Sequence, residues 1–221
     1  MSYKDKKDLV KLLSFMSTFD GGLYIRHKNA SFILNMRKEN LDYVLWVQSV
    51  ISSITSSIIE DRPDYSTDGY ERSEQVRLYS RTHPFLTTLH SRIYINKHKV
   101  IDPHMLKLLD AEALAIIFMT DGSASQKHGI RFHTKGFSYS DNMAISQSIF
   151  KKLGLRTNIN RHNKYFELRL KSADIGKFVE LVKPYICPSF RYKLERIAPH
   201  PTVGDEIVWP EWEHSEVIRN V

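Results

Sequence analysis

Apolar residues recur at helical spacing in two stretches of the chain, and both stretches end in Asp-Gly. The first runs from Leu12 to Gly22 and ends at Asp20-Gly21, and the second runs from Leu114 to Gly122 and ends at Asp121-Gly122. A helix C-terminus is the negative end of the helix dipole, so an acid there is disfavoured unless a cation joins it. Asp-Gly is also common at a plain helix end, where the glycine adopts the left-handed conformation. Because the pattern occurs once in each half of the 221-residue chain, we favour two metal-site candidates, Asp20 and Asp121.

The same order of periodic elements surrounds each of these stretches. Helical spacing predicts helices over residues 5–19, 40–54, 84–93, 107–120, 140–153 and 173–182, with Ser138 or Ser140 as N-cap and Gly154 as the stop of the fifth. Strict alternation predicts strands over residues 32–37, 75–81, 129–135, 156–161 and 165–170. The fold class is therefore α+β, with two pseudo-symmetric αββαββα halves at residues 1–95 and 107–194. A polar segment at 96–106 joins the halves, and an acidic tail occupies 195–221.

One face of the predicted strands is rich in basic, amide and aromatic side chains in both halves. A solvated outer face is the usual explanation of such alternation, but its recurrence favours antiparallel sheets that read DNA in the major groove. The candidate DNA-binding residues of the first half are Arg26, Lys28, Asn35, Arg37, Gln75, Arg77, Tyr79 and Arg81. Those of the second half are Arg131, His133, Lys135, Arg156, Asn158, Arg161, Glu167 and Arg169.

The amino-acid composition indicates the cellular compartment of the protein and the charge of its partner. The chain is 42% hydrophobic with a net charge of +7, enough apolar content for a proper core. Residues 195–221 carry two basic and six acidic side chains, so the rest of the chain carries +11, which favours a polyanionic partner. A single cysteine, Cys187, excludes an internal disulfide and a cysteine-rich zinc site. With no secretory signal or membrane-spanning run, we expect an intracellular protein, in the cytoplasm or an organelle matrix, and no membrane partner.

The motif Leu114-Ala115-x-x-Phe118-Met119-x-Asp121-Gly122 resembles the second motif of the LAGLIDADG homing endonucleases of the single-chain type. Further matching segments are Tyr43-Val44-Leu45-Trp46, Lys99-Val100-Ile101-Asp102-Pro103, Phe132-His133-Thr134, Phe137-Ser138, Lys183-Pro184-Tyr185-Ile186 and Tyr192-Lys193-Leu194. The resemblance covers roughly residues 9 to 194 and leaves out the acidic tail. The first motif departs from the family pattern, with Phe15 and Phe19 where small residues usually let two motif helices touch.

This resemblance implies a monomer whose two sheets form a DNA-binding saddle around a central pair of motif helices. It implies that Asp20 and Asp121 hold divalent metals, Mg²⁺ or Mn²⁺, for hydrolysis of one phosphodiester in each DNA strand. It also implies an active-site lysine near each half-site, at Lys193 and at Lys99, although Lys97 replaces Lys99 if the loop is shifted.

The main hypothesis is a metal-dependent DNA endonuclease that makes a double-strand break at a long asymmetric target. One alternative is a maturase or splicing factor that binds intron RNA on the same fold. Another is a DNA-binding protein that has lost cleavage, which the retention of both aspartates argues against.

Overall fold

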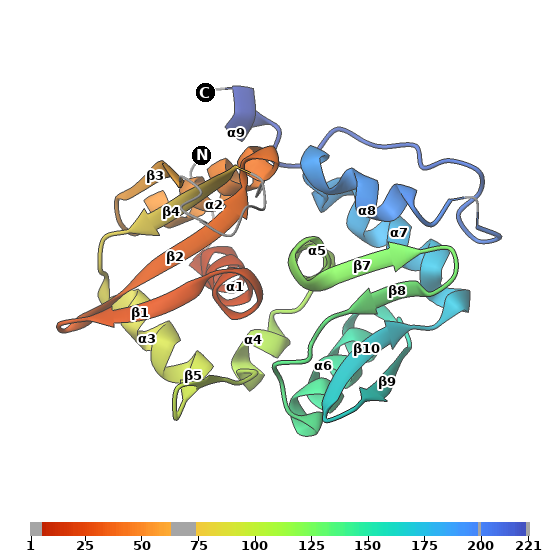
Figure 1. Ribbon diagram of the computed structural model, residues 1–221, viewed down its shortest axis with the longest axis horizontal. Helices are drawn as coiled ribbons and strands as arrows, with labels where there is room; N and C mark the ends of the chain where they lie inside the picture. The colour runs from red at the N-terminus through yellow and green to blue at the C-terminus, as the bar shows by residue number, and fades with distance from the viewer. Residues whose placement is uncertain (1–5, 63–73, 199, 220–221) are drawn as a thin grey trace, which may run out of the picture. The chain divides into compact units, whose positions relative to one another are not determined.

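The computed structural model describes residues 6–62, 74–198 and 200–219, and it divides the chain into two compact units (Figure 1). Unit 1 comprises Met1–Ser91 and His214–Val221, and unit 2 comprises Arg92–Glu213. The chain therefore passes from unit 1 to unit 2 and returns to unit 1 at its end. The segment at 96–106 and most of the acidic tail belong to unit 2.

Unit 1 begins with the first motif helix and continues through two strand pairs. Its helical elements are α1 (Lys6–Phe15), the π-helical turn η1 (Met16–Asp20), the 3-10 turn η2 (Lys38–Asn40), α2 (Leu41–Ser52), α3 (Pro84–Ile93, whose last two residues lie in unit 2) and α9 (Glu216–Arg219). Its strands are β1 (Gly22–Arg26), β2 (Asn29–Arg37), β3 (Ser57–Arg62) and β4 (Gln75–Ser80).

Unit 2 repeats this order after a short β-hairpin. Its strands are β5 (Tyr94–Ile95), β6 (His98–Lys99), β7 (Gly122–Ser125), β8 (Gly129–Phe132), β9 (Thr157–His162) and β10 (Tyr165–Leu170). Its helices are α4 (Pro103–Lys107), α5 (Ala111–Asp121), α6 (Tyr139–Leu153), α7 (Ile175–Val182) and α8 (Arg191–Glu195), with 3-10 turns η3 (Ser172–Asp174), η4 (Lys183–Tyr185) and η5 (Pro188–Phe190).

The two four-stranded antiparallel sheets have the same topology. The strand order is β1-β2-β4-β3 in unit 1 and β7-β8-β10-β9 in unit 2, so in each sheet a hairpin precedes an inserted second pair. This repetition confirms the predicted α+β class with two αββαββα halves.

Helices cover one face of each sheet and leave the other face polar. In unit 1, α2 contacts β2, β3 and β4, and its Trp46 is fully buried against the ring of Tyr43. In unit 2, α6 packs behind β9 and β10 (Figure 1). The rings of Phe118, Phe132 and Phe178 meet edge to face where α5 and α7 pack, with centroids 5.3 to 6.5 Å apart. Burial of such rings supplies the largest apolar contribution to a core.

Several predicted boundaries are corrected by the structure. The helix expected over 107–120 begins only at Ala111, because Asp110 caps it by accepting a hydrogen bond from the Ala113 N–H at 2.9 Å. The strand expected over 129–135 ends at Phe132, because the Phe137 N–H donates to the Thr134 carbonyl in a turn. The segment 96–106, expected to connect the halves, contains β6 and the start of α4. Residue 5, the expected start of the first helix, lies outside the described residues.

Other expected ends are confirmed. Ser138 caps α6 in a reciprocal box with Asp141, and Gly154 closes the helix in the left-handed conformation at φ 64°. Within the described ranges 6–62, 74–198 and 200–219, no helix has the length and apolarity that crossing a membrane requires.

Candidate active site and nucleic-acid interface

Asp121 is the last residue of α5, the second motif helix. The helix closes with a hydrogen bond from the Gly122 N–H to the Phe118 carbonyl, and the chain enters β7 directly. Gly122 has φ −100° and ψ 153°, so the left-handed glycine of a simple helix cap, considered above, is absent here. Glycine is needed for space instead, because a Cβ on Gly122 would lie 2.4 Å from the Phe118 carbonyl oxygen.

Lys193 on α8 donates hydrogen bonds to carbonyl groups at the C-terminal end of α5. Its ammonium donates to the Met119 carbonyl at 2.5 Å and to the Gly122 carbonyl at 2.9 Å, with a longer contact to Phe118. The Asp121 carbonyl accepts from the His133 N–H at 2.6 Å. A cation at this position offsets the negative end of the helix dipole beside the Asp121 carboxylate.

The Asp121 carboxyl lies in a desolvated environment with two lysines acting on it. Burial raises its pKa from 3.8 to about 6, while the charges of Lys99 and Lys193 act in the opposite direction. Lys99 is half-buried on β6, opposite Tyr94. Lys97 is exposed in the hairpin turn, in the left-handed conformation at φ 67°, and its charge does not figure among the causes of the Asp121 shift. The structure thus brings Asp121, Lys99 and Lys193 together within unit 2.

Asp20 ends the first motif helix in unit 1 through a wider turn. The helix changes from α1 to the π-helical η1, and the Gly21 N–H donates to the Met16 carbonyl at 2.7 Å, five residues back. Phe15 and Phe19 are both buried, and their rings stack with centroids 6.2 Å apart and planes 9° apart. The structure therefore accommodates the two phenylalanines of the divergent motif on one side of a π-turn.

Gly21 fits the close approach of this turn to β2. A Cβ at this position would lie 2.2 Å from the buried Phe32 ring, so no larger residue can be added without displacing that ring. The glycine that follows the aspartate is thus required in both units by packing at the end of the motif helix.

The oxygen ligands that the site offers suit a hard cation, which would take its remaining ligands from the substrate. Among the described residues there is no cluster of three or more His, Cys, Asp or Glu that could hold a metal by protein ligands alone. A desolvated carboxylate at the negative end of a helix gains from an added cation, and oxygen is the ligand that Mg²⁺ and Mn²⁺ prefer. Asp121 therefore fits a magnesium site completed by phosphate and water.

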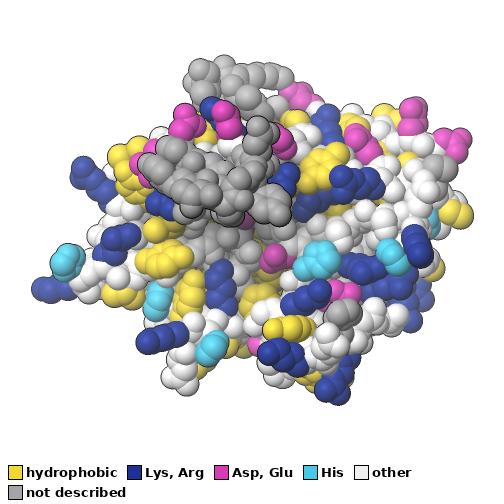
Figure 2. All heavy atoms as spheres, in the orientation of Figure 1, with side chains coloured by type: hydrophobic (Ala, Val, Ile, Leu, Met, Phe, Trp, Pro, Cys, Tyr) yellow, Lys and Arg dark blue, Asp and Glu magenta, His cyan; other side chains and the backbone are white. Residues whose placement is uncertain are grey.

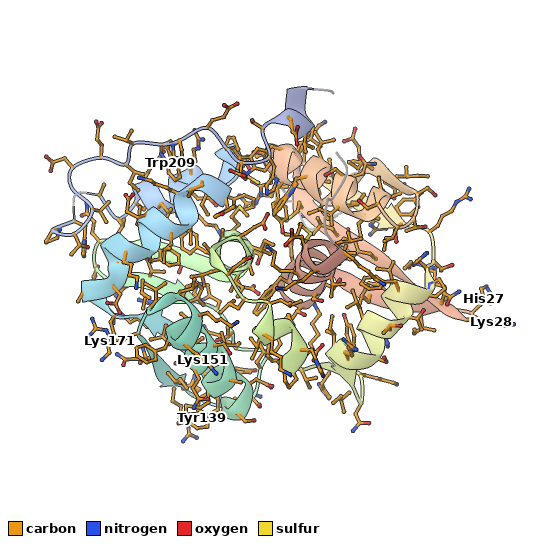
Figure 3. All side chains as sticks on the ribbon, turned by 180° about the vertical axis from the view of Figure 1, so that it is seen from behind. His27, Lys28, Tyr139, Lys151, Lys171 and Trp209 are labelled. Atoms are coloured by element: carbon orange, nitrogen blue, oxygen red, sulfur yellow. The ribbon has the colours of Figure 1, made fainter. Side chains whose placement is uncertain are left out.

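The polar sheet face of unit 1 is hollowed into a groove of about 510 Å³. Its lining combines four predicted DNA-binding residues, Arg26, Arg77, Tyr79 and Arg81, with Ser31, Ile33, Glu60, Ser80 and Thr82. Arg77 lies opposite Asn35 in the β2–β4 ladder and donates to its side-chain oxygen at 2.9 Å. Arg37 pairs with Gln75 on the same face. Lys28 and its neighbour His27 occupy the tip of the β1–β2 hairpin (Figure 3).

The polar sheet face of unit 2 gathers its side chains around one acid. Glu167 on β10 is only 7% exposed, and its carboxylate lies 3.7 to 3.9 Å from nitrogens of Arg131, His133 and Lys135. The side-chain oxygen of Ser123 and Nε2 of His133 are 2.8 Å apart, and Ser123 lies two residues after Asp121. Burial lowers the pKa of His133, and the nearby Glu167 charge partly offsets this. Arg169 lies opposite Arg131 and Asn158 in the sheet.

Two predicted DNA-binding residues do not join this face. Arg156 precedes β9 and binds Asp174 through two guanidinium hydrogen bonds of 2.7 and 2.9 Å, which lowers the pKa of that carboxyl. Arg161 lies opposite Phe166, whose ring packs on Tyr139 of α6, so it belongs to the helix-facing side of the sheet. Alternation could have separated Arg161 from Asn158, because residues three apart in a strand face opposite sides. The binding of Arg156 by Asp174 could not be read from the strand pattern, because Asp174 lies 18 residues further along the chain.

Sequence reasoning missed Ser123, Tyr24, Ile33 and Glu60, which also lie at the polar faces. They belong to or pair with the short strands β1, β3 and β7, for which the sequence provides little alternation. The polar alternation of Tyr24 and Arg26 was a usable signal for β1.

The acidic tail packs on the helix that carries Lys193. The Arg191 guanidinium lies 5.0 Å from the Trp209 ring centre and donates to the Pro210 carbonyl at 3.0 Å. The Trp209 indole N–H donates to Glu195 at 3.1 Å, so its ring is held along α8 (Figure 3). Beyond Trp209, the buried His214 stacks on Trp46 of unit 1 at 4.5 Å.

A motif helix that ends in an acid beside an antiparallel sheet with a basic polar face, built twice in one chain, defines a two-repeat nucleic-acid-processing protein. The family model described as the LAGLIDADG DNA endonuclease family matches residues 20–178. The chain belongs to this family, and the family resemblance of the sequence is confirmed. Membership supports the prediction of a homing endonuclease with a double-stranded DNA partner.

Individual relatives agree with this assignment. The chain is 30% identical over 103 residues, 46% of its length, to a probable intron-encoded DNA endonuclease 3 of Mycosarcoma maydis, and spans 76% of that protein. It is 33% identical over 99 residues, 43% of its length, to the cytochrome b mRNA maturase bI2 of Saccharomyces cerevisiae, and spans only 23% of that protein. A solved structure of the homing endonuclease I-WcaI bound to its DNA recognition sequence matches with a TM-score of 0.72 at 20% identity, with 86% of each chain covered. That likeness confirms the fold.

Proposed function

We propose that this chain is a site-specific homing endonuclease that makes a double-strand break at a long asymmetric DNA target by metal-dependent phosphodiester hydrolysis. The observation that carries the proposal is the desolvated Asp121 carboxyl, acted on by Lys99 and Lys193, at the point where α5 leads directly into strand β7 of the unit 2 sheet. The two halves differ in nearly every outward residue, and two different faces suit a target without internal symmetry.

Asp121 and Asp20 would each hold a divalent ion, which when bound supplies Lewis-acid activation of water and phosphate. Lys99 is placed to stabilise charge that develops on the phosphate near Asp121, because its ammonium is one of the two charges acting on this carboxyl. Lys193 fixes the end of α5 through its bonds to the Met119 and Gly122 carbonyls, and so holds the Asp121 carboxylate in place. Asp20, Asp121, Lys99 and Lys193 are the proposed catalytic residues, and Mg²⁺ the proposed cofactor.

The proposed DNA contacts are the outward residues of the two sheets. Arg26, Arg77, Tyr79 and Arg81 share the unit 1 groove, and Arg131, His133, Lys135, Arg169 and Asn158 lie on the unit 2 face. Arginine and lysine bind phosphates and guanine edges, while asparagine suits adenine. We propose that one monomer of the chain supplies both faces.

The test is incubation of the protein with DNA of the uninterrupted host locus, with and without Mg²⁺. We expect cutting of both strands that needs the ion and disappears in Asp121→Asn while binding persists. Binding without cutting by the wild type under every divalent ion tried would contradict the proposed hydrolysis and favour a DNA-binding protein.

An RNA function is a second candidate, favoured by the similarity to a yeast cytochrome b mRNA maturase. Its test is a splicing assay with the intron transcript that surrounds the reading frame. Acceleration of splicing that survives Asp121→Asn would assign the maturase role to surfaces other than the acid site.

A further inference from the structure

Glu167 is an unusual residue for a surface that binds a polyanion. It is a carboxylate at the centre of the unit 2 sheet, and it is nearly buried although the side chains around it are not. The side chain of Glu167 is 9% exposed, against 41% for His133 and 45% for Lys135. An acid at this position repels phosphate, so its presence weakens binding to DNA in general.

The corresponding position of unit 1 has the opposite charge. Arg77 is the third residue of β4, and Glu167 is the third residue of β10, the strand with the same place in the sheet order. Arg77 contacts the neutral Asn35, whereas Glu167 is surrounded by the cations Arg131 and Lys135 and by His133. Unit 1 also has an acid on its polar face, Glu60, but it lies opposite Arg77 on the edge strand β3. An acid on the inner strand itself is therefore a feature of unit 2 and not of the repeated fold.

The contacts of the Glu167 carboxylate are long enough for other partners to replace them. All three nitrogens lie 3.7 to 3.9 Å from the carboxylate, beyond the 2.7 to 2.9 Å expected of a charge-assisted hydrogen bond. The Glu167 oxygens thus have lone pairs available for a closer donor. Cytosine N4 and adenine N6 present such amino groups in the major groove.

We propose, on the basis of the function proposed above, that Glu167 sets the sequence specificity of unit 2. It holds Arg131 and Lys135 in ion pairs, with His133 beside them, and random DNA must break these ion pairs to reach the two cations. A DNA site that offers a base amino group to the Glu167 carboxylate replaces the broken ion pairs with a new hydrogen bond. A DNA site that offers only phosphates leaves the carboxylate without a replacement. Glu167 thereby lowers the affinity for unmatched DNA more than the affinity for the target.

In Figure 2, Lys and Arg side chains gather over the strands of unit 2, with His and acidic side chains among them. Arg131 and Arg169 are direct neighbours across the β8–β10 ladder, and such like charges repel each other. A purely structural role for Glu167, the relief of this repulsion, would change stability but not the ratio between two DNA sequences.

The experiment selects bound duplexes from a randomised DNA library with wild type and with Glu167→Gln. Affinities for the wild-type consensus and for a scrambled duplex are then measured across salt concentrations. We expect Glu167→Gln to bind the scrambled duplex about tenfold more tightly, with a steeper salt dependence, and to lose base preference at a few adjacent positions of the selected site. Glu167→Asp, which keeps the charge, should retain most of the wild-type ratio.

Glu180→Gln is the matched control, because Glu180 is an exposed acid on α7 that pairs with Lys183 at 2.6 Å, and its loss changes the net charge equally. We expect this variant to keep the wild-type ratio. An unchanged ratio in Glu167→Gln, or equal weakening towards both duplexes, would overturn the assignment while leaving the endonuclease proposal intact. Selection of no consensus by the wild type would overturn both.

Discussion

The two motif helices end in the same Asp-Gly pair but reach it by different backbone paths. In unit 2, α5 remains α-helical to Asp121, and β7 starts at the next residue. In unit 1, the helix widens into a π-turn over Met16–Asp20, and Gly21 separates Asp20 from the start of β1. The first motif thus has one residue, Gly21, between helix and strand, whereas the second has none.

This difference shows which features of the motif are required. Both units keep an acid at the helix end and a glycine after it, although the hydrogen-bond pattern and the packing of aromatic rings differ. π-helical turns are rare and occur frequently at functional sites. Each motif helix therefore ends in an acid, although the backbone that leads to the acid differs between the two units.

The largest expected effect tests whether the two acids are equivalent. Asp20→Asn and Asp121→Asn should each lower double-strand cleavage by about a thousandfold or more, because removal of a group that stabilises transition-state charge has effects of this size. Rates are measured with a supercoiled plasmid that carries the target, and binding is measured in Ca²⁺. Nicking of one strand by either variant would show that the two sites act independently, and full cleavage by one variant would remove its aspartate from the chemistry.

Substitution of Gly21 and Gly122, the glycines that follow the two aspartates, tests the difference between the two helix ends. Gly122→Ala should destabilise by about 2 to 3 kcal/mol, because its Cβ meets the Phe118 carbonyl, which cannot move without distorting α5. Gly21→Ala should cost somewhat less, since the Phe32 ring can shift within the core. Urea denaturation followed by circular dichroism measures both, and Gly136→Ala is a control because a Cβ there meets no atom within 4 Å. Equal stability of all three variants would contradict the packing argument.

The lysines of unit 2 should differ in what they affect. Lys193→Met should lower both cleavage and stability, the latter by about 2 kcal/mol, because hydrogen bonds from a charged donor to the end of α5 are lost. Lys99→Met should lower cleavage with little change in the urea midpoint. Lys97→Met, in the exposed turn, is the control for Lys99. If Lys97→Met were the inactive variant, the active-site lysine would be Lys97.

The smallest expected effect is the pH dependence that Asp121 gives to the metal-free protein. Its pKa of about 6 in the folded protein lies above the ordinary 3.8, so the folded state binds a proton more tightly than the unfolded state. Stability from this group is present below about pH 4 and is lost as the pH rises through 6. In EDTA, Asp121→Asn should therefore be more stable than wild type by about 2 kcal/mol at pH 8 and by little at pH 4. A wild type that is the more stable of the two at pH 8 would contradict a desolvated Asp121.

Much of the fold was predictable from local pattern. Long periodic segments such as α2 and α6 were located within one or two residues, because their apolar stripes coincide with the face that each buries. The short strands β1, β3 and β7 were not located by alternation. They contain glycine and serine or few residues, and they are held in place by ladder partners that lie elsewhere in the chain.

The candidate site was predictable residue by residue but not as an arrangement. Lys193 was identified by resemblance, yet its bonds to Met119 and Gly122 join groups more than 70 residues apart in sequence. Arg156 has the same side chain as Arg169, but its guanidinium is bound by the Asp174 carboxylate. Only the tertiary fold distinguishes these two arginines.

The sequence by itself determined the repeated helix that ends in Asp-Gly, the alternation of polar and apolar residues in the strands of two sheets, and the family to which the chain belongs. The spacing of apolar residues indicates which face of a helix or strand is buried, so these features can be predicted from neighbouring residues alone. The tertiary structure decided the π-turn that ends at Asp20, the capping of α5 by Lys193, the raised pKa of Asp121 and the placement of Arg131, Lys135 and His133 around Glu167. Each of these depends on strand register and on the approach of segments distant in sequence, where desolvation and distance set the energies.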